Sequence, residues 1–363
     1  MLGNAGAIRL RARLFSSKKL KSKGNVSKKA LSDENITDRK YVFICGLQRS
    51  GTSVLARNIG KLESCTSFKN TGVLQDEGQY LQDVYRPDGA YGGTGRYGFD
   101  PRAHLTEKSR LLTPENVARL HRSWHSYWDP AKSICVEKTP GNLIMTRFLQ
   151  AAFPNSYFIV IRRHPVPVSM ATQRWKVSLT PLHRLFEHWL RCYDLFEEDK
   201  AHLKRVYELS YEEYIKEPDK YHREIALFIG TRTPPASLEE VTDVHNKRYF
   251  DRWSNLLTNS SFKSYYRYIA SKYEPRLARY NYSLLSSPGT GRSEEREASD
   301  TPAVVGALYC LGADANALAW RITLQSKWLI KRTLRAHLPE PVKAGIKRLL
   351  GRPSLEKQTV NVN

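Results

Sequence analysis

The chain has 363 residues, of which 40% are hydrophobic and 26% are charged. A chain of this length and composition fills one large domain and leaves further segments over. No uninterrupted apolar run approaches the roughly 18–20 residues that cross a bilayer, so we expect a soluble or peripheral protein. The five cysteines are odd in number and scattered through the chain, so we expect no disulfide framework and a reducing compartment.

The formal net charge of +22 is concentrated toward the ends of the chain. Residues 1–40 carry 11 basic and 3 acidic side chains, and the first 32 residues contain no acid. The segment from Ile8 to Ser17 has the arginine- and serine-rich composition of an organelle transit peptide, and a disordered basic arm has the same composition. We therefore expect a cytoplasmic protein, with organelle targeting through residues 1–30 as the alternative.

The first predicted strand, residues 41–45, runs into a loop with the spacing of a phosphate-binding loop. The loop consists of a glycine, four further residues, a second glycine and two hydroxyl residues: Gly46, Gly51, Thr52 and Ser53. Glycines in this pattern let backbone N–H groups surround phosphate oxygens, and the helical spacing that follows places a helix N-terminus against the anion. Thr52 stands where a nucleotidase has lysine, so Arg49 is the nearest cation. The alternative is a simple tight turn.

Two segments farther along carry candidate residues of the site. Asp76 and Glu77 follow Gly72 as a pair of adjacent acids, which the helix dipole alone favours at a helix start. Residues 85–101 are rich in glycine and tyrosine, so we predict no regular structure there. Such a loop can serve as an adaptable lid over the acceptor or can be a surface loop without a role.

A helix is predicted to begin near Thr113 and Pro114. His121 and His125 are four residues apart on one face of it, but no third ligand is evident, so we interpret them as a surface pair and not as a zinc site. The predicted packing stripe of this helix is aromatic and aliphatic: Leu120, Trp124, Tyr127 and Trp128.

Two further strands are predicted to end beside the phosphate loop. Residues 134–136 are a short strand, and Lys138 follows it into the same crevice or is a solvated loop charge. Residues 157–161 form an apolar run typical of a buried parallel strand, which ends in Arg162 and Arg163 where a nucleotidase has a metal-binding aspartate. We therefore expect no metal, and an arginine that contacts a second phosphate or lies on the surface.

The C-terminal part of the chain is predicted to be separate from the main domain. Residues 286–302 have the Ser-, Gly- and charge-rich composition of a linker. Residues 303–363 have helical spacing, with basic side chains among apolar ones, and Pro339 and Pro341 divide them into two helices. This basic amphipathic segment can pack on the main domain or lie on an anionic membrane.

Together these blocks resemble the sulfotransferases that use 3′-phosphoadenosine 5′-phosphosulfate (PAPS), of the bacterial, carbohydrate and tyrosylprotein type. The resemblance covers about residues 41–280 and rests on four blocks in the expected order: Gln48–Ser53, Glu137-Lys138-Thr139-Pro140-Gly141-Asn142, Ile161–Thr172, and Tyr211-Glu212-Glu213-Tyr214 with the helical segment after it. It implies an α/β fold, a P-loop-like three-layer sandwich with a central parallel sheet and helices on both faces.

The resemblance also implies roles for individual residues. Glu77 is the expected catalytic base, with Asp76 as its competitor, and Lys138 is expected to stabilise the leaving phosphate. The expected donor-binding residues are those of the loop, the second motif and the strand after it: Arg49, Ser50, Gly51, Thr52, Ser53, Arg163, Ser169 and Tyr211. The family's serine eight residues after the arginine is Ala171 here, so Ser169 and Thr172 are the candidate replacements. Tyr211 is expected to lie against adenine or to be a plain core tyrosine.

We therefore predict a PAPS-dependent sulfotransferase whose partners are PAPS and a hydroxyl of a carbohydrate, glycolipid or small metabolite, with no nucleic acid. The alternatives are a P-loop small-molecule kinase and a basic scaffold that binds lipid or nucleic acid through its tails. The predicted organisation is a basic arm or transit-like segment (1–40), a sulfotransferase domain (41–285), a linker (286–302) and a basic helical segment (303–363). Residues 303–363 are also expected to contact an anionic membrane if they do not pack on the main domain.

Overall fold

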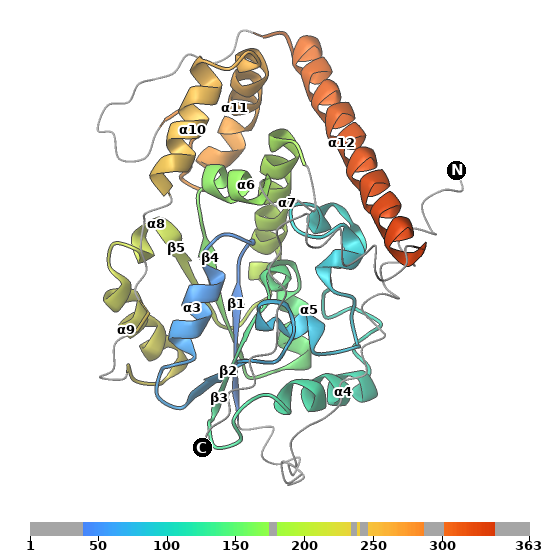
Figure 1. Cartoon of the computed structure of the whole chain (residues 1–363). Helices are drawn as coiled ribbons and strands as arrows, with labels where there is room; N and C mark the ends of the chain where they lie inside the picture. Colours follow the sequence, from blue (N-terminus) through green and yellow to red (C-terminus); the bar gives the residue numbers. More distant parts are fainter. Residues whose placement is uncertain (1–38, 174–179, 234–237, 240–245, 287–300, 338–363) are drawn as a thin grey trace, which may run out of the picture.

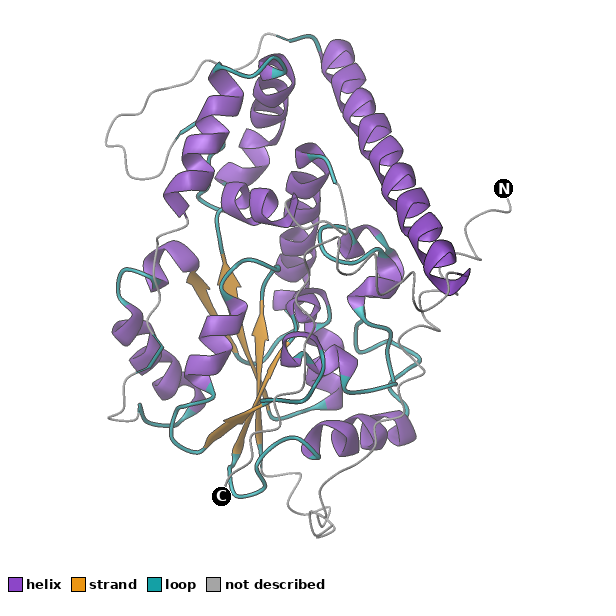
Figure 2. Ribbon diagram, viewed as in Figure 1, coloured by secondary structure: helices purple, strands orange, loops and turns teal. Residues whose placement is uncertain are grey.

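The computed structural model describes residues 39–173, 180–233, 238–239, 246–286 and 301–337. Its centre is a five-stranded parallel sheet in the order β2-β3-β1-β4-β5 (Figures 1 and 2). The strands are β1 (Lys40–Cys45), β2 (Cys65–Ser67), β3 (Ile134–Lys138), β4 (Ser156–Arg162) and β5 (Val206–Ser210). Because β1 pairs with both β3 and β4, the ends of these three strands lie at one edge of the sheet.

The sheet is buried on both faces, which explains why its strands are continuous apolar runs. In β1, Val42 and Ile44 belong to the core on one face, while Tyr41 and Phe43 belong to the core on the other. Side chains that alternate along a strand point to opposite faces, so the central strands β1 and β4 are apolar at almost every residue.

Helices cover each face, which confirms the predicted α/β fold with layers on both sides of a parallel sheet. One face carries α3 (Thr52–Ile59), α8 (Tyr211–Tyr214) and α9 (Pro218–Ile229). The other face carries α4 (Pro114–His125), α5 (Thr146–Ala152), α6 (Pro165–Gln173), α7 (Leu182–Lys200), α10 (Asn246–Thr258) and α11 (Lys263–Ala278). The second layer is larger and contains most of the buried aromatic rings.

Helix α4 begins where the sequence predicts, because the Thr113 side chain caps it by accepting a hydrogen bond from the Asn116 N–H at 3.2 Å. The prediction that His121 and His125 form a surface pair is wrong. Both are buried against Tyr41, whose hydroxyl lies 3.0 Å from Nε2 of His125. His121 contacts the carbonyl of Ala152 through Nε2 at 2.9 Å.

The predicted stripe of α4 is correct for Leu120, Trp124 and Trp128, which are buried, but wrong for Tyr127, which is exposed. The helix ends at His125, so the helical spacing that places Tyr127 beside Trp124 no longer applies beyond that residue.

A long C-terminal helix, α12 (Ala303–His337), runs along α11 and the upper part of the second layer (Figure 1). Its described part ends at His337, so the helix break predicted at Pro339 and Pro341 lies outside the described residues. Within the described residues, its segment Ala303–Thr323 is long and apolar enough to cross a membrane by length and composition. The sequence analysis did not identify this segment because Asp314 and Arg321 interrupt the apolar run.

Several predictions concern residues outside the described ranges. These are the basic arm up to residue 38, most of the linker, and the second C-terminal helix beyond residue 337. The five cysteines are all free, as expected from their scattered positions.

The turn after β1 generates a testable expectation. Gly46 has φ +148°, and a Cβ atom there would lie 2.4 Å from the carbonyl oxygen of Ile161 in β4. Gly46→Ala is expected to lower the free energy of unfolding by at least about 3 kcal/mol, because strained backbone and a backbone clash combine. Urea denaturation measures this. Gly89→Ala, which has no heavy atom within 4 Å of the added Cβ, is the control and should change stability by less than about 0.5 kcal/mol.

Candidate active site

The loop between β1 and α3 has the backbone shape of an anion-binding loop. Gly46 and Gly51 both have positive φ, and Arg49 adopts φ +72°, which is strained for a residue with a side chain. Among the described residues no side chain caps the first turn of α3, and that turn contains no acid. Its N–H groups therefore remain directed at the loop, where the positive end of the helix dipole favours an anion.

The predicted loop residues differ in accessibility. Arg49 is exposed, and Gly51 and Ser53 are partly exposed. Ser50 and Thr52 are buried, and the Ser50 N–H donates to the Leu47 carbonyl at 3.1 Å, which closes the turn. The loop can thus offer an anion its guanidinium and backbone, with Ser53 as its more accessible hydroxyl.

Arg163 lies directly against this loop, as the parallel pairing of β1 with β4 requires. Its guanidinium donates to the Arg49 carbonyl at 2.7 Å and to the Asn246 side chain at the start of α10. It also lies over the ring of Tyr211, 4.1 Å from the centroid. The structure therefore brings Arg49, Arg163 and Tyr211 together. Tyr211 also packs on Gly51, where a Cβ would lie 2.7 Å from the ring.

The neighbouring arginine has a different environment. Arg162 pairs with Glu197 at 2.7 Å and with Glu208 at 3.1 Å, and it lies over the rings of Tyr193 and Tyr280. Its charge is neutralised within the fold. Of the two arginines at the end of β4, Arg163 is thus the one placed at the phosphate loop.

Glu77 and Lys138 form a buried ion pair at the end of β3. Nζ of Lys138 lies 3.1 Å from Oε1 of Glu77 and also donates to the Gln75 carbonyl at 3.2 Å. The second carboxylate oxygen accepts a hydrogen bond from the Gln79 side chain at 2.6 Å. Lys138 pairs in register with Ile44 of β1, which places the ion pair beside the strand that leads into the phosphate loop.

Asp76, the competing candidate base, is held away from this pair. Its carboxylate accepts hydrogen bonds from the Thr71 N–H at 2.8 Å and the Thr71 hydroxyl at 2.6 Å. Burial acts to raise the pKa of Asp76, but these hydrogen bonds outweigh it and hold the pKa below its ordinary value. Asp76 serves the local turn, so Glu77 is the better placed base.

Glu137 supports the backbone that carries Glu77. Its wholly buried carboxylate accepts hydrogen bonds from the Gly78 N–H at 2.9 Å, the Thr139 hydroxyl at 2.6 Å and the Asn142 side-chain amide. Burial raises the pKa of Glu137 to about 7, although these hydrogen bonds oppose the shift. Glu137 is the first residue of the sequence motif that ends at Asn142, but the motif alone predicted no role for it.

A second carboxylate that the sequence analysis missed joins the loop of residues 85–101 to the phosphate loop. Asp88 accepts a hydrogen bond from the Gln48 side chain at 2.8 Å. Burial, and then the nearby charge of Glu77, raise the pKa of Asp88 to about 6. The loop is not irregular as predicted but contains short 3-10 turns at Asp88–Tyr91 and Tyr97–Phe99. Its Pro-Asp-Gly sequence was the available signal for the first of these turns.

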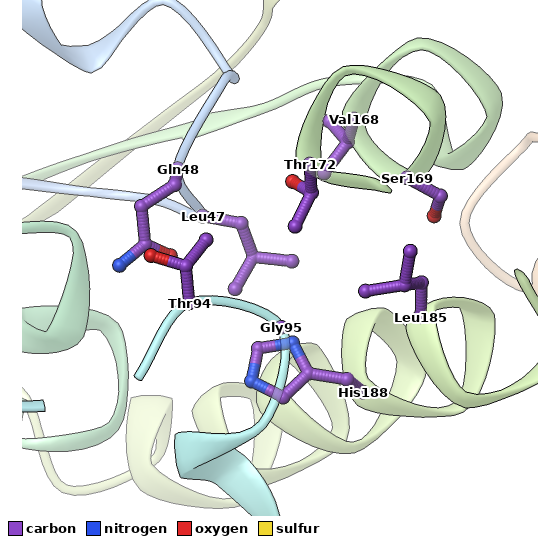
Figure 3. A pocket seen from close by; sticks show the side chains of 9 residues that line it. All are labelled: Leu47, Gln48, Thr94, Gly95, Val168, Ser169, Thr172, Leu185 and His188. Carbon is purple, nitrogen blue, oxygen red and sulfur yellow. The ribbon is translucent and has the colours of Figure 1, made fainter. Parts of the chain in front are cut away.

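Ser169 has no hydrogen bond to Arg163 within the described residues. It lines a small cavity between the phosphate loop, α6 and α7, with Gln48, Thr172 and His188 among its other walls (Figure 3). The Ser169 hydroxyl is buried and has no hydrogen-bond partner in the described part of the chain. The cavity has room for about one water molecule, so it does not admit a nucleotide in this conformation.

The described residues contain no group of three or more His, Cys, Asp or Glu side chains that could hold a metal ion. The cations at the site are side chains of the chain itself, Arg49, Arg163 and Lys138.

The titration of Glu137 is measurable. Because its pKa is about 7 in the folded chain and ordinarily 4.5, the unfolded chain binds fewer protons between these two pH values. The free energy of unfolding should therefore fall as pH rises from about 4.5 to 7, by an amount on the order of 3 kcal/mol. In Glu137→Gln this part of the pH dependence should vanish. Chemical denaturation across this range is the measurement, with Glu198→Gln on the exposed face of α7 as the control.

A wild-type chain and a Glu137→Gln variant with the same slope of stability against pH would contradict the assignment.

Comparisons with known proteins identify the family of the chain. Residues 42–235 match the model of the sulfotransferase family. Similar solved structures include a Mycobacterium tuberculosis H37Rv sulfotransferase (14% identity, 60% of this chain and 73% of that one, TM-score 0.37). Others are the sulfotransferase domains of the Synechococcus PCC 7002 olefin synthase (18%, 59% and 83%, 0.38) and of the curacin biosynthetic pathway (14%, 68% and 99%, 0.41). A comparison with curated proteins gave no match. Since the family model covers more than half of the chain, this protein belongs to the sulfotransferase family and is a sulfotransferase.

Proposed function

We propose that the protein transfers a sulfuryl group from PAPS to a hydroxyl of a carbohydrate, glycolipid or other small metabolite. The observation that carries this proposal is the arrangement at the ends of β1, β3 and β4. A phosphate loop without its lysine, an arginine against that loop and a buried Glu77–Lys138 pair converge there. PAPS would supply the activated sulfuryl group and a second phosphate for recognition.

The donor fits the two cationic positions of the site. The 5′-phosphosulfate of PAPS binds at the phosphate loop, where the uncapped turn of α3 and the exposed Arg49 supply hydrogen-bond donors for its oxygens. The 3′-phosphate takes Arg163, whose side chain is already fixed by Asn246, the Arg49 carbonyl and the ring of Tyr211. A guanidinium held in place loses little conformational entropy when a phosphate binds. We assign Tyr211 to the positioning of Arg163.

Glu77 is the proposed general base. Its carboxylate lies 3.1 Å from the Lys138 ammonium at the end of β3, and a carboxylate is the group that accepts the proton of the acceptor hydroxyl. The hydrogen bonds from Gln79 to Glu77 and from Gly78 to Glu137 fix the direction of the carboxylate. A base held in this way requires little reorganisation when the acceptor arrives.

Lys138 is the proposed group that stabilises the departing phosphate, together with Arg49. As the sulfuryl group moves in line toward the acceptor, negative charge grows on the bridging oxygen of the donor. A buried ammonium is far more effective against such charge than an exposed one, because little water screens it. When Glu77 accepts the proton, Lys138 loses its charged partner, so its interaction with the leaving oxygen strengthens.

The proposed class of acceptor rests on the loop of residues 85–101, because this loop lies beside the phosphate loop and Glu77. Asp88 contacts Gln48 of the phosphate loop. It also lies close enough to Glu77 for the charge of Glu77 to raise the pKa of Asp88. Polar and aromatic side chains of this loop suit a hydroxylated acceptor such as a sugar ring.

Donor binding is tested by isothermal titration of adenosine 3′,5′-bisphosphate. Arg163→Ala should weaken binding by about 10- to 100-fold, because a charge-assisted pair of hydrogen bonds is lost. Arg162→Ala, which removes the adjacent arginine from its carboxylate partners, should leave the affinity within about threefold of wild type. Equal losses in the two variants would refute the assignment of Arg163, and no binding to the wild-type chain would refute the donor.

Catalytic roles are tested by turnover with labelled PAPS. Glu77→Gln and Lys138→Met should each lower kcat by about 10²–10⁴ while the affinity for adenosine 3′,5′-bisphosphate stays within a few-fold. Asp76→Asn is the matched control and should retain most activity. A loss confined to Asp76→Asn would transfer the role of base to that residue. Turnover with ATP and magnesium, and none with PAPS in EDTA, would instead indicate a kinase.

A further inference from the structure

Helix α12 packs on the domain through a narrow stripe of small residues. Gly306 and Ala317 are buried and Cys310 and Ala313 are half-buried, which is the spacing of one helical face. A Cβ at Gly306 would lie 2.1 Å from the ring of Tyr268 in α11, so only glycine permits this contact. The stripe fixes which side of α12 faces outward.

The two charged residues of the segment Ala303–Thr323 are both half-buried at the edge of this stripe. Asp314 pairs with Arg184 at 2.8 Å and lies 3.4 Å from Nε2 of His183, both at the start of α7. Arg321 donates from Nε to the carbonyl of Ala317 at 3.2 Å. The charges that interrupt the apolar run therefore do not belong to its outward face.

The outward face is apolar over its whole length. Large side chains with 54–74% exposure recur along it: Val304, Leu308, Leu311, Leu318 and Ile322. At 1.5 Å per residue, 21 residues give an uncharged face roughly 30 Å long. Only 11% of the apolar window is buried within the described structure. An apolar surface of this extent marks a contact site and not an ordinary protein surface.

Positive charge follows the apolar face in the sequence. Residues 315–339 contain five Lys or Arg and no Asp or Glu, on a chain whose net charge is +22. Basic residues that follow an apolar helical face, with exposed Trp320 and Tyr309 on the same helix, are the combination found on helices that lie on anionic membranes.

The same helix lies near the loop proposed to admit the acceptor. Burial, and then the positive charge of Arg321 on α12, lower the pKa of Arg96 in that loop. Nε of Arg96 donates to the Thr180 hydroxyl at 3.1 Å just before α7. Figure 1 shows the lower half of α12 beside the segment that contains this loop. The loop in turn contacts the phosphate loop through Asp88 and Gln48.

We infer that α12 lies on the surface of an anionic lipid bilayer with its outward apolar face in the headgroup region, and that the acceptor hydroxyl is carried by a lipid. The second part rests on the function proposed above. With α12 on the membrane, the loop of residues 85–101 beside it is brought near the bilayer surface, where the hydroxyl of a lipid headgroup would reach Glu77 while soluble PAPS binds at the phosphate loop.

The contacts of α12 favour a helix on the membrane surface over one that crosses it. Crossing would require α12 to leave α11, to break the Asp314–Arg184 pair and to expose the small-residue stripe. A surface position keeps these contacts and uses only the face that is already exposed. In this position the exposed apolar side chains enter the headgroup region without any change in the backbone.

A second copy of the chain is the other possible occupant. Val304, Leu308, Leu311, Ala315, Leu318 and Ile322 follow the alternating four- and three-residue spacing of a coiled-coil seam. Coiled coils, however, carry charged residues beside the seam. On one flank of this seam Val305, Gly312 and Ala319 are exposed and uncharged, and on the other flank Asp314 already pairs with Arg184 within the chain. An apolar face wider than a seam favours lipid.

The test is cosedimentation of the full-length chain with vesicles. Wild type should bind vesicles of phosphatidylcholine that contain about 30% phosphatidylglycerol, which gives them a strong negative surface potential. Binding should weaken at high salt, and vesicles of phosphatidylcholine alone should bind little protein. Leu308→Glu/Leu318→Glu should reduce binding at least about 100-fold. The matched control is Leu227→Glu on α9, which makes the same change at a leucine that is 82% exposed and should bind as wild type does.

No binding of wild type to anionic vesicles, or equal loss in the control, overturns the membrane contact. Sedimentation velocity of the same samples identifies the other occupant. A wild-type dimer that becomes monomeric in Leu308→Glu/Leu318→Glu, without vesicle binding, assigns the face to a second copy. Binding of adenosine 3′,5′-bisphosphate should be equal in all variants. Its absence refutes the proposed donor site and leaves the vesicle result standing.

The lipid-borne acceptor is tested with labelled PAPS. Total lipids of the producing cells, in anionic vesicles, and their water-soluble metabolites are offered separately. Label in the lipid fraction, reduced at least about tenfold by Leu308→Glu/Leu318→Glu, supports the inference. Label confined to the water-soluble fraction, or no label in lipid, overturns it.

Discussion

The hydrogen bond from Arg163 to the carbonyl of Arg49 is the contact on which the site depends. It joins the end of β4 to the loop after β1, and it exists because these two strands are neighbours in a parallel sheet. The contact requires the close approach of Gly46 to Ile161 and the left-handed backbone of Arg49. One bond thus connects the fold, the strained loop and the two cations proposed to hold the ends of PAPS.

The parallel sheet and the phosphate loop could be predicted because they follow local rules. Strands buried on both faces are uniformly apolar, and a loop at a helix N-terminus needs glycines at fixed positions. Arg163 and Lys138 could be placed for the same reason, since each follows a strand end. The buried histidines of α4 could not, because a histidine that bonds Tyr41 looks in the sequence like one that faces water.

Contacts between loops were also beyond the sequence. Glu137 supports Gly78 and Asp88 meets Gln48 only after strands that are 40 or more residues apart have come together. The environment of Ser169 depends on which side of α6 faces α7, and the spacing after Arg163 does not determine this. The outward face of α12 was hidden by two charges that turn away from it, Asp314 toward Arg184 of α7 and Arg321 toward the carbonyl of Ala317.

The bond between Gln48 and Asp88 has a consequence for kinetics. Gln48 belongs to the loop proposed for the donor, and Asp88 to the loop proposed for the acceptor. A displacement of either side chain breaks or strengthens the same bond, so occupancy of one substrate changes the free energy at which the other enters. Coupling carried by this bond is reciprocal, so donor and acceptor would change each other's affinity by the same factor.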